Sequence, residues 1–201
     1  MDSNSTNIID KSYFESLTKL DPDDLCQKAL CRYDKEKKSY TILVWGNEYT
    51  IFPQELKIEC SDGKFNPHEL FYLFVIFYLL NLKDVKVKNE WISEKDIPGG
   101  TTFFRGPHEI PTDLISKRYK NDLKAFSEKC IELGGIELDF ADAAYRFDIV
   151  PHIPIAALYW EGDDDFPPEA KILYDRTIMD HLTSDIIFSL AVQVCARIGE
   201  V

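Results

Sequence analysis

The feature of the sequence that most limits its fold is an apolar run over residues 70–82, in which Asn81 is the one polar residue. The preceding Asn66-Pro67-His68-Glu69 is typical of a helix start, because Asn66 can cap the first turn and Glu69 can reach back to it. A helix that spans a bilayer needs about 17 or more apolar residues. This shorter run therefore predicts a central helix buried on all sides in a folded protein.

Length and composition favour a globular protein with a sizeable core. A chain of 201 residues can bury roughly 70% of the surface that its unfolded form exposes, so it needs no disulfide or metal for stability. The content of 45% hydrophobic and 29% charged residues is far from that of disordered chains. We expect one domain over residues 1–201, with residues 1–10 as a disordered tail.

The net charge indicates which classes of partner to exclude, and the cysteines indicate the cellular compartment. The net charge of -12 repels nucleic-acid phosphates and anionic lipid head groups, so we expect neither nucleic acid nor membrane as a partner. The five cysteines are odd in number, and no segment reads as a secretory leader. We therefore expect a cytoplasmic protein.

The first half of the chain predicts helices followed by a hairpin. Apolar residues recur at helical spacing from Tyr13 to Leu20, and Asp21-Pro22 is typical of a second helix start. Residues 40–45 and 48–52 are rich in β-formers and flank Gly46-Asn47, which predicts a β-hairpin. Residues 57–60 predict a short third strand.

The second half predicts a loop, a long helix, three strands and two closing helices. Residues 98–108 are rich in glycine and proline and predict an irregular loop, and one helix is expected from Pro111-Thr112 to Leu133. Strands are expected near residues 144–150, 155–160 and 171–174. The prediction is an α+β fold: N-terminal helices and a hairpin, a buried central helix, and C-terminal antiparallel strands closed by helices.

The loop at residues 98–108 is a candidate anion site. Arg105 and His108 stand beside Gly99, Gly100 and Gly106, so backbone amides can approach a ligand while the guanidinium binds a carboxylate or phosphate. The pattern matches neither a P-loop nor a dinucleotide fingerprint.

The second candidate is the acidic loop, residues 160–168. Trp160 and four carboxylates stand close together at a strand end, where Asp163 and Asp165 could hold a divalent cation. Repulsion among the carboxylates is expected to raise some of their pKa values. In the alternative interpretation, Arg105 only neutralises this loop in an ion pair.

Asp175 and His181 follow the acidic loop and could converge with it at one end of the sheet. Helix capping by Asp175 and Asp185 is the structural alternative, and it is the interpretation we favour. His152 is interpreted as a packed histidine. Cys26 and Cys31 are too few for an iron–sulfur cluster and are interpreted as core or surface thiols, so we expect no such cluster in this chain.

Three stretches together resemble the family called domain of unknown function 3786, known from anaerobic bacteria and archaea. They are residues 100–111, 151–175 with the core Trp-Glu-Gly-Asp-Asp-Asp-Phe-Pro-Pro, and 180–197. The resemblance implies a protein without an established activity, and an accessory role in anaerobic redox or one-carbon metabolism. Members of this family often carry an added cysteine-rich segment of the iron–sulfur type, and this chain has no such segment.

Three functional hypotheses follow. The first is a non-catalytic domain that binds a small polar ligand or a partner protein in one pocket. The second is a metal-assisted hydrolase or transferase built on Asp163 and Asp165. The third is a structural subunit whose loops form an interface. The candidate ligand-binding residues are Arg105, His108, Trp160, Asp163, Asp165, Asp175 and His181.

Overall fold

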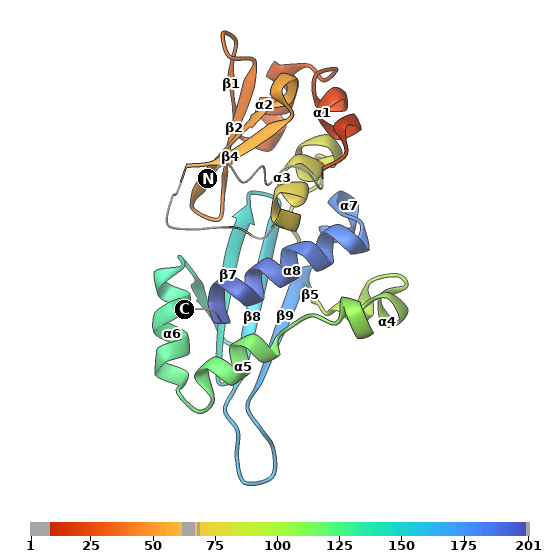
Figure 1. The fold of residues 1–201 in the computed structure, drawn as a ribbon. Coiled ribbons are helices and arrows are strands. Elements are labelled where there is room, and N and C mark those ends of the chain that lie inside the picture. Colours follow the sequence, from red (N-terminus) through yellow and green to blue (C-terminus); the bar gives the residue numbers. More distant parts are fainter. Residues whose placement is uncertain (1–8, 62–66, 68, 200–201) are drawn as a thin grey trace.

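The computed structural model describes residues 9–61, 67 and 69–199. The fold is α+β, as predicted, with two antiparallel sheets and helices packed around them (Figure 1). One hydrophobic core runs through both sheets and the helices between them.

The first sheet contains the predicted hairpin. Side chains of its two central strands alternate between buried and more exposed, because successive residues of a strand point to opposite faces. A short first strand was not predicted. The order is β1-β2-β3-β4, with bounds β1 (Arg32–Asp34), β2 (Ser39–Val44), β3 (Asn47–Phe52) and β4 (Lys57–Cys60).

Two short helices, α1 (Lys11–Leu17) and α2 (Pro22–Ala29), precede this sheet. Of the predicted disordered tail, residues 1–8 lie outside the described part of the chain. Ile9 is buried, and the Asp10 carboxylate caps α1 by accepting a hydrogen bond from the Ser12 amide at 2.8 Å. The prediction of disorder is therefore wrong for these two residues.

The central helix is α3 (Glu69–Asn81), and no position from 70 to 80 along it is exposed. The Phe71 ring lies edge-on to Tyr49 of the first sheet at 5.9 Å, and Leu70 O accepts a hydrogen bond from Ser189 Oγ at 2.6 Å. Contacts on both sides confirm a core helix. No helix in the described residues has the length and apolar character to cross a membrane. The predicted cap Asn66 and His68 lie outside the described residues.

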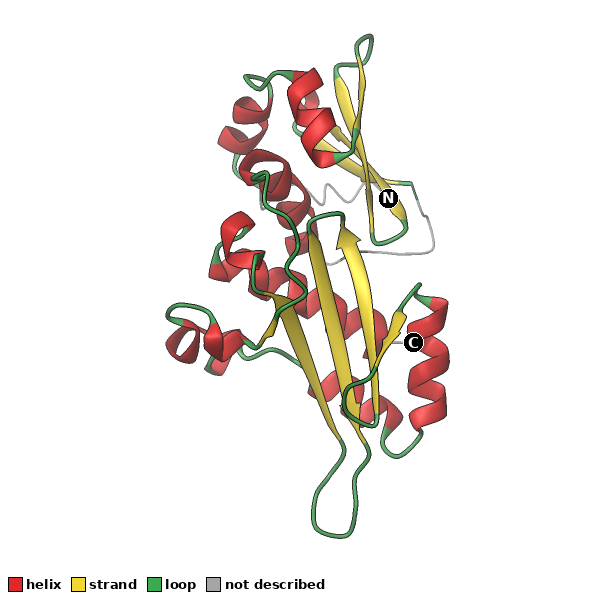
Figure 2. Ribbon diagram, turned by 180° about the vertical axis from the view of Figure 1, so that it is seen from behind, coloured by secondary structure: helices red, strands yellow, loops and turns green. Residues whose placement is uncertain are grey.

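The second sheet has the order β5-β9-β8-β7-β6 and contains the three predicted C-terminal strands. Helices cover one of its faces (Figure 1), and no helix of the described residues lies over the other (Figure 2). Its strands are β5 (Trp91–Ile92), β6 (Ile136–Leu138), β7 (Ala143–Val150), β8 (Ile153–Trp160) and β9 (Glu169–Asp175). The covering helices are α5 (Asp113–Tyr119), α6 (Leu123–Glu132) and α8 (Ser184–Gly199), and α7 (Ile178–His181) precedes α8.

The single helix predicted over residues 111–133 is wrong, because the chain breaks between α5 and α6. Lys120 has a φ of 51°, which ends α5, and Asp122 caps α6 by accepting a hydrogen bond from the Ala125 amide at 2.9 Å. The Tyr159 hydroxyl donates to Lys120 O and fixes the break. The apolar stripe continues across the break, so periodicity alone did not reveal it.

Candidate functional site

The candidate anion loop is more regular than predicted. It contains a short helix, α4 (Gly100–Phe103), and a 3-10 turn, η3 (Gly106–His108). A side chain at Gly100 would lie 1.9 Å from the carbonyl oxygen of Glu94, so only glycine lets α4 pack against the preceding turn, η2 (Glu94–Asp96).

Arg105 and His108 lie on the surface of this loop. The His108 ring stacks on Phe103 at 4.6 Å and meets Phe188 of α8 edge-on at 5.3 Å. No carboxylate among the described residues lies within ion-pair distance of Arg105. The predicted ion pair between Arg105 and the acidic loop is therefore not formed.

Hydrogen bonds within the acidic loop shape its end, and Asn121 and Asp142 bond the backbone of Gly162 and Glu161 at its base. Asp163 Oδ1 accepts the amides of Asp165 and Phe166, each at 2.8 Å. Hydrogen bonds from these two amides lower the pKa of Asp163. The expectation that repulsion raises the carboxyl pKa values is thus wrong for Asp163, because donors close to its oxygens favour the charged form.

The two loops lie at opposite ends of β9. The acidic loop joins Trp160 to Glu169 at one end, whereas Asp175 at the other end pairs with Trp91 of β5. The segment after β5 leads through η2 to α4, and Figures 1 and 2 both show α4 well away from the loop between β8 and β9. A strand of seven residues spans roughly 20 Å. The structure therefore does not bring the two loops into one pocket.

Asp175 is a buried structural carboxylate. It is 1% exposed and accepts hydrogen bonds from the amides of Lys88, Asn89 and Thr177 and from the Thr177 hydroxyl. Burial alone would raise the pKa of Asp175, but these hydrogen bonds outweigh it and the pKa is lowered. Asp175 does not cap α7, whose N-cap is Thr177. It fixes the connection between α3 and β5 instead.

His181 belongs to a second buried polar cluster. Its Nδ1 accepts the Lys83 amide at 3.3 Å, and its ring lies 5.9 Å from that of His152, whose Nδ1 is 2.8 Å from the Tyr78 hydroxyl. Burial, and then the neighbouring His152, lowers the pKa of His181. The cluster confirms His152 as a packed histidine and places His181 in the interior, not with the acidic loop.

Trp160 lies on the face of the second sheet opposite the main core. It lies half-buried against a small apolar cluster of the second sheet that contains Ala156 and Leu158. Within the described part of the chain, no three His, Cys, Asp or Glu side chains are placed to hold a metal ion together. Metal binding by Asp163 and Asp165 stays a prediction.

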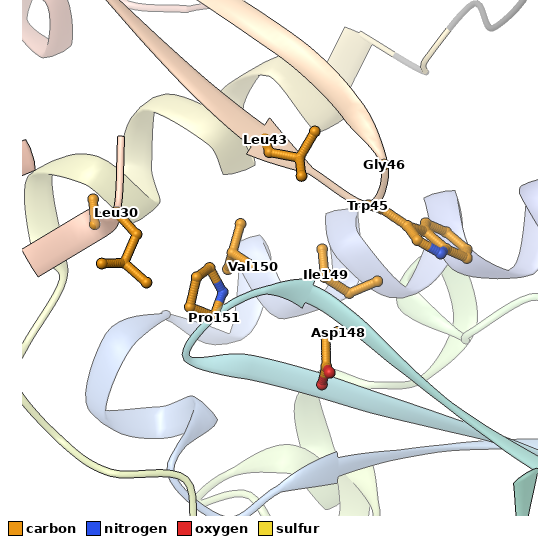
Figure 3. Close-up of a pocket in the computed structure, with 9 residues that line it drawn as sticks. Leu30, Leu43, Trp45, Gly46, Asp148, Ile149, Val150 and Pro151 are labelled. Carbon is orange, nitrogen blue, oxygen red and sulfur yellow. The ribbon is translucent and has the colours of Figure 1, made fainter. Parts of the chain in front are cut away.

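A hollow that the sequence did not indicate lies where the tip of the β2–β3 hairpin meets the end of β7 (Figure 3). Its volume is about 320 Å³, and Asp148 is the charged residue of its lining. That carboxylate is 2.7 Å from the Arg146 guanidinium, so its charge is balanced. We call this hollow the Trp45 groove; it is lined by Ala29, Leu30, Leu43, Trp45, Gly46, Asp148, Ile149, Val150 and Pro151.

The groove wall contains a tryptophan in an unusual backbone conformation. Strand β2 ends at Val44, so the two turn residues are Trp45 and Gly46, with φ values of 44° and 80°. The predicted turn at Gly46-Asn47 is therefore displaced by one residue. Left-handed positions of hairpin turns favour glycine and asparagine, so a tryptophan there costs on the order of 1–3 kcal/mol.

Contacts from distant elements hold Trp45 in this conformation. The Arg197 guanidinium lies 4.4 Å from its ring centroid and donates to its carbonyl oxygen at 2.8 Å. The indole Nε1 donates to Leu133 O at 3.1 Å, and the amide donates to Ile149 O at 2.7 Å. Trp45 is 5% exposed. This side of the groove is thus fixed before anything binds.

Sequence reasoning missed the groove because its lining comes from three separate stretches of the chain. The one local sign was Trp45 immediately before Gly46 at a hairpin tip, where a polar residue is the rule.

A family model described as domain of unknown function (DUF3786) matches residues 21–197. This match includes every residue that lines the Trp45 groove. No curated protein and no solved structure matches the chain.

Proposed function

The chain belongs to the family described as domain of unknown function (DUF3786), and we propose that it is a binding protein whose Trp45 groove receives apolar side chains of a partner protein. One observation carries this proposal. Two of the most exposed large apolar side chains among the described residues, Leu30 and Leu43, converge on the same hollow beside Trp45.

Convergence distinguishes these leucines from ordinary exposed apolar residues. Leu30 is 69% exposed and Leu43 is 58% exposed. Single exposed leucines are common on protein surfaces, but apolar side chains gathered around a hollow are typical of interaction sites. Full burial of a leucine contributes about 1.5–3 kcal/mol, so covering both would stabilise a complex appreciably.

The shape of the groove favours a protein partner over a small molecule. Its volume of about 320 Å³ is at the lower limit for a small-molecule pocket, and its most apolar side chains project from the rim. An anchoring side chain in the hollow, with apolar contacts around it, is the usual arrangement at the centre of a protein interface. The rigid Trp45 lowers the entropy cost of binding.

The net charge of the chain favours a partner whose surface is positively charged. At -12 the protein attracts a partner of positive charge and accelerates its association at low ionic strength. An accessory role in redox or one-carbon metabolism, which the family resemblance implied, would suit such a binding protein and stays a prediction.

Photocrosslinking tests the proposal directly. The full chain would carry benzoylphenylalanine at Leu43 in source cells, and a matched chain would carry it at Phe166, which is 71% exposed on the acidic loop. We expect one discrete protein adduct from position 43 and none of that size from position 166. A Leu30→Lys substitution should abolish the adduct while the circular dichroism spectrum is unchanged.

Two results would reject the groove as a binding site. The first is the same adducts from both positions, which would mean random collision. The second is no adduct from position 43 in cells where the protein is abundant.

The polar candidates from the sequence are separate surface sites in this proposal. Arg105 and His108 would bind an anion on one side of the molecule, and Asp163 with Asp165 would bind a divalent cation at the acidic loop. A rise in Tm on adding magnesium, calcium or manganese, lost in Asp163→Asn, would support the cation site; an unchanged Tm would remove the metal-assisted alternative.

A further inference from the structure

Two cysteines lie in contact at the end of α2. Leu30 follows the helix with a φ of 52°, a left-handed conformation that turns the chain back over the last helical turn. This turn brings Cys31 against Cys26, and the Cys31 thiol donates a hydrogen bond to Cys26 Sγ at 3.4 Å. All five cysteines lie in the described part of the chain, and this is the pair whose sulfurs meet.

The two thiols differ in their access to solvent. Cys31 is buried, whereas Cys26 is partly exposed. Burial, followed by the hydrogen bond and charge of Cys26, raises the pKa of Cys31 to about 12. Cys31 therefore stays a protonated thiol at neutral pH, and a reagent in solution reaches Cys26 first.

We propose that Cys26 and Cys31 form a redox-active dithiol that is oxidised to an intramolecular disulfide by exchange with a thiol-derived disulfide. Cys26, as its thiolate, attacks one sulfur of the incoming disulfide, which breaks the S–S bond and releases one thiolate. Cys31 then loses its proton and attacks Cys26 Sγ in the mixed disulfide, which releases the second thiolate. The two cysteines lose two electrons and two protons, and the incoming disulfide is reduced to two thiols.

The local geometry requires little movement for this reaction. The two sulfurs are 3.4 Å apart, and a disulfide bond is about 2.05 Å long, so they must approach by roughly 1.4 Å. One side of the bond would be the partly exposed Cys26, and exposed disulfides are among the more easily reduced and reversible ones. The pair therefore fits a reversible redox site better than a permanent crosslink.

The other three cysteines differ from this pair in their burial or in their sulfur contacts. Cys130 and Cys195 are fully buried and pack in the hydrophobic core, and burial raises the pKa of each thiol. Cys60 is partly exposed, as Cys26 is, but its sulfur is not one of the pair in contact. Cys60 is thus a matched control for a solvent-accessible single thiol.

The position of the pair is next to the Trp45 groove, since Ala29 and Leu30 line the groove and stand between the two cysteines. The redox proposal does not depend on what the groove binds. A chain that binds no partner could still undergo this exchange.

A peptide map after oxidation tests the proposal on the full reduced chain. The chain is treated with glutathione disulfide, free thiols are alkylated, and the protein is digested with trypsin without reduction. Trypsin cleaves after Lys28 and Arg32, so residues 20–28, with Cys26, separate from residues 29–32, with Cys31. We expect these two peptides to be joined, the free thiols to fall from five to three, and dithiothreitol to restore all five.

Single variants check the order of events. In Cys31→Ser, glutathione should remain attached to Cys26, because the resolving thiol is gone. In Cys26→Ser, Cys31 should stay free, and Cys60→Ser should form the disulfide as the parent chain does. Five free thiols after oxidation, or glutathione on Cys26 of the parent chain with no joined peptides, would overturn the proposal. The parent chain alone decides this outcome, even if a variant folds poorly.

Discussion

Two hairpin tips of this molecule have opposite relationships to the rest of the fold. The tip at Trp45-Gly46, between β2 and β3, packs on the end of β7 and is held by residues far away in the sequence. The tip at residues 161–168, between β8 and β9, projects from the molecule (Figure 1), and the Asp163 turn holds its end. Distant residues of the described chain hydrogen-bond to it only at its base, where Asn121 bonds Gly162 and Asp142 accepts the Glu161 amide. The first is apolar and strained, and the second is acidic and exposed.

The difference shows which kind of unusual residue indicates a binding site. Exposed carboxylates are solvated at little cost, so a run of them needs no ligand to account for it. A tryptophan with positive φ has a real energetic cost and persists only where the surrounding structure imposes it. The strained tip is therefore the stronger candidate, although the acidic tip is more conspicuous in the sequence.

The largest expected contrast comes from truncating the aromatic residue of each tip. Trp45→Ala should lower the free energy of unfolding by about 3–5 kcal/mol, because it removes a buried ring and its contact with Arg197. Phe166→Ala should change it by less than about 0.5 kcal/mol, because Phe166 is 71% exposed. Urea unfolding of both variants measures these changes. Similar losses of unfolding free energy in the two variants would contradict the proposed difference between the tips.

A smaller effect tests whether the acidic tip is flexible, as its exposure suggests, or well ordered. A side chain at Gly162 would lie 2.7 Å from both the Cδ and the N of Pro168. Gly162→Ala should therefore lower the free energy of unfolding by about 1–3 kcal/mol, as overpacking does. An unchanged unfolding midpoint would mean that the loop moves to accommodate the added methyl group. The acidic tip would then be held less firmly than the structure indicates.

The next effect in size is a gain in stability from relieving backbone strain at Leu30, beside the groove. Leu30 has a φ of 52° and an exposed side chain, so Leu30→Gly should raise the free energy of unfolding by up to about 1 kcal/mol. The same change should weaken crosslinking at position 43, because it removes part of the groove rim. A gain in stability with full crosslinking would show that Leu30 does not take part in binding.

The smallest effect concerns Asp163 and appears in the pH dependence. The folded chain holds the pKa of Asp163 below its usual value of 3.8 through two backbone amides, so its contribution is present above that pH and lost as the pH falls through the lowered value. Asp163→Asn should have a slightly lower Tm than the parent near pH 7. The gap should close in acid.

Thermal melts from pH 7 to strongly acidic buffer measure this gap. Asp164→Asn is the matched control, because it removes a neighbouring charge of the same loop without touching the Asp163 turn. A gap that widens in acid would mean that the Asp163 hydrogen bonds do not stabilise the folded state.

Much of the secondary structure could be predicted because it depends on local patterns. The apolar run of α3, the hairpin of β2 and β3, and the stripe of α8 all follow from spacing along the chain. The break between α5 and α6 could not be predicted from periodicity, because both helices bury the same apolar stripe. The break depends on the positive φ of Lys120 and on its contact with Tyr159 of a distant strand. Strands β1, β5 and β6, of two or three residues each, carry too short a pattern.

The candidate sites were predicted less well than the fold. Arg105, His108 and Asp163 lie on the surface as exposed loop residues, but no local pattern indicated that the two loops lie at opposite ends of β9. Asp175 and His181 carry polar groups that the sequence assigned to ligand binding. In the structure these groups instead satisfy the backbone of the connection between α3 and β5.

The sequence by itself determined an acidic chain with a fully apolar helix, two sets of antiparallel strands and membership of an α+β class, since periodicity and composition are properties of neighbouring residues. The tertiary structure alone decided that residues 29–30, 43–46 and 148–151 enclose one groove, and that a tryptophan forms its wall. The reason is that a hollow is the space left where separate elements pack, and its existence depends on distances between segments that no local pattern encodes.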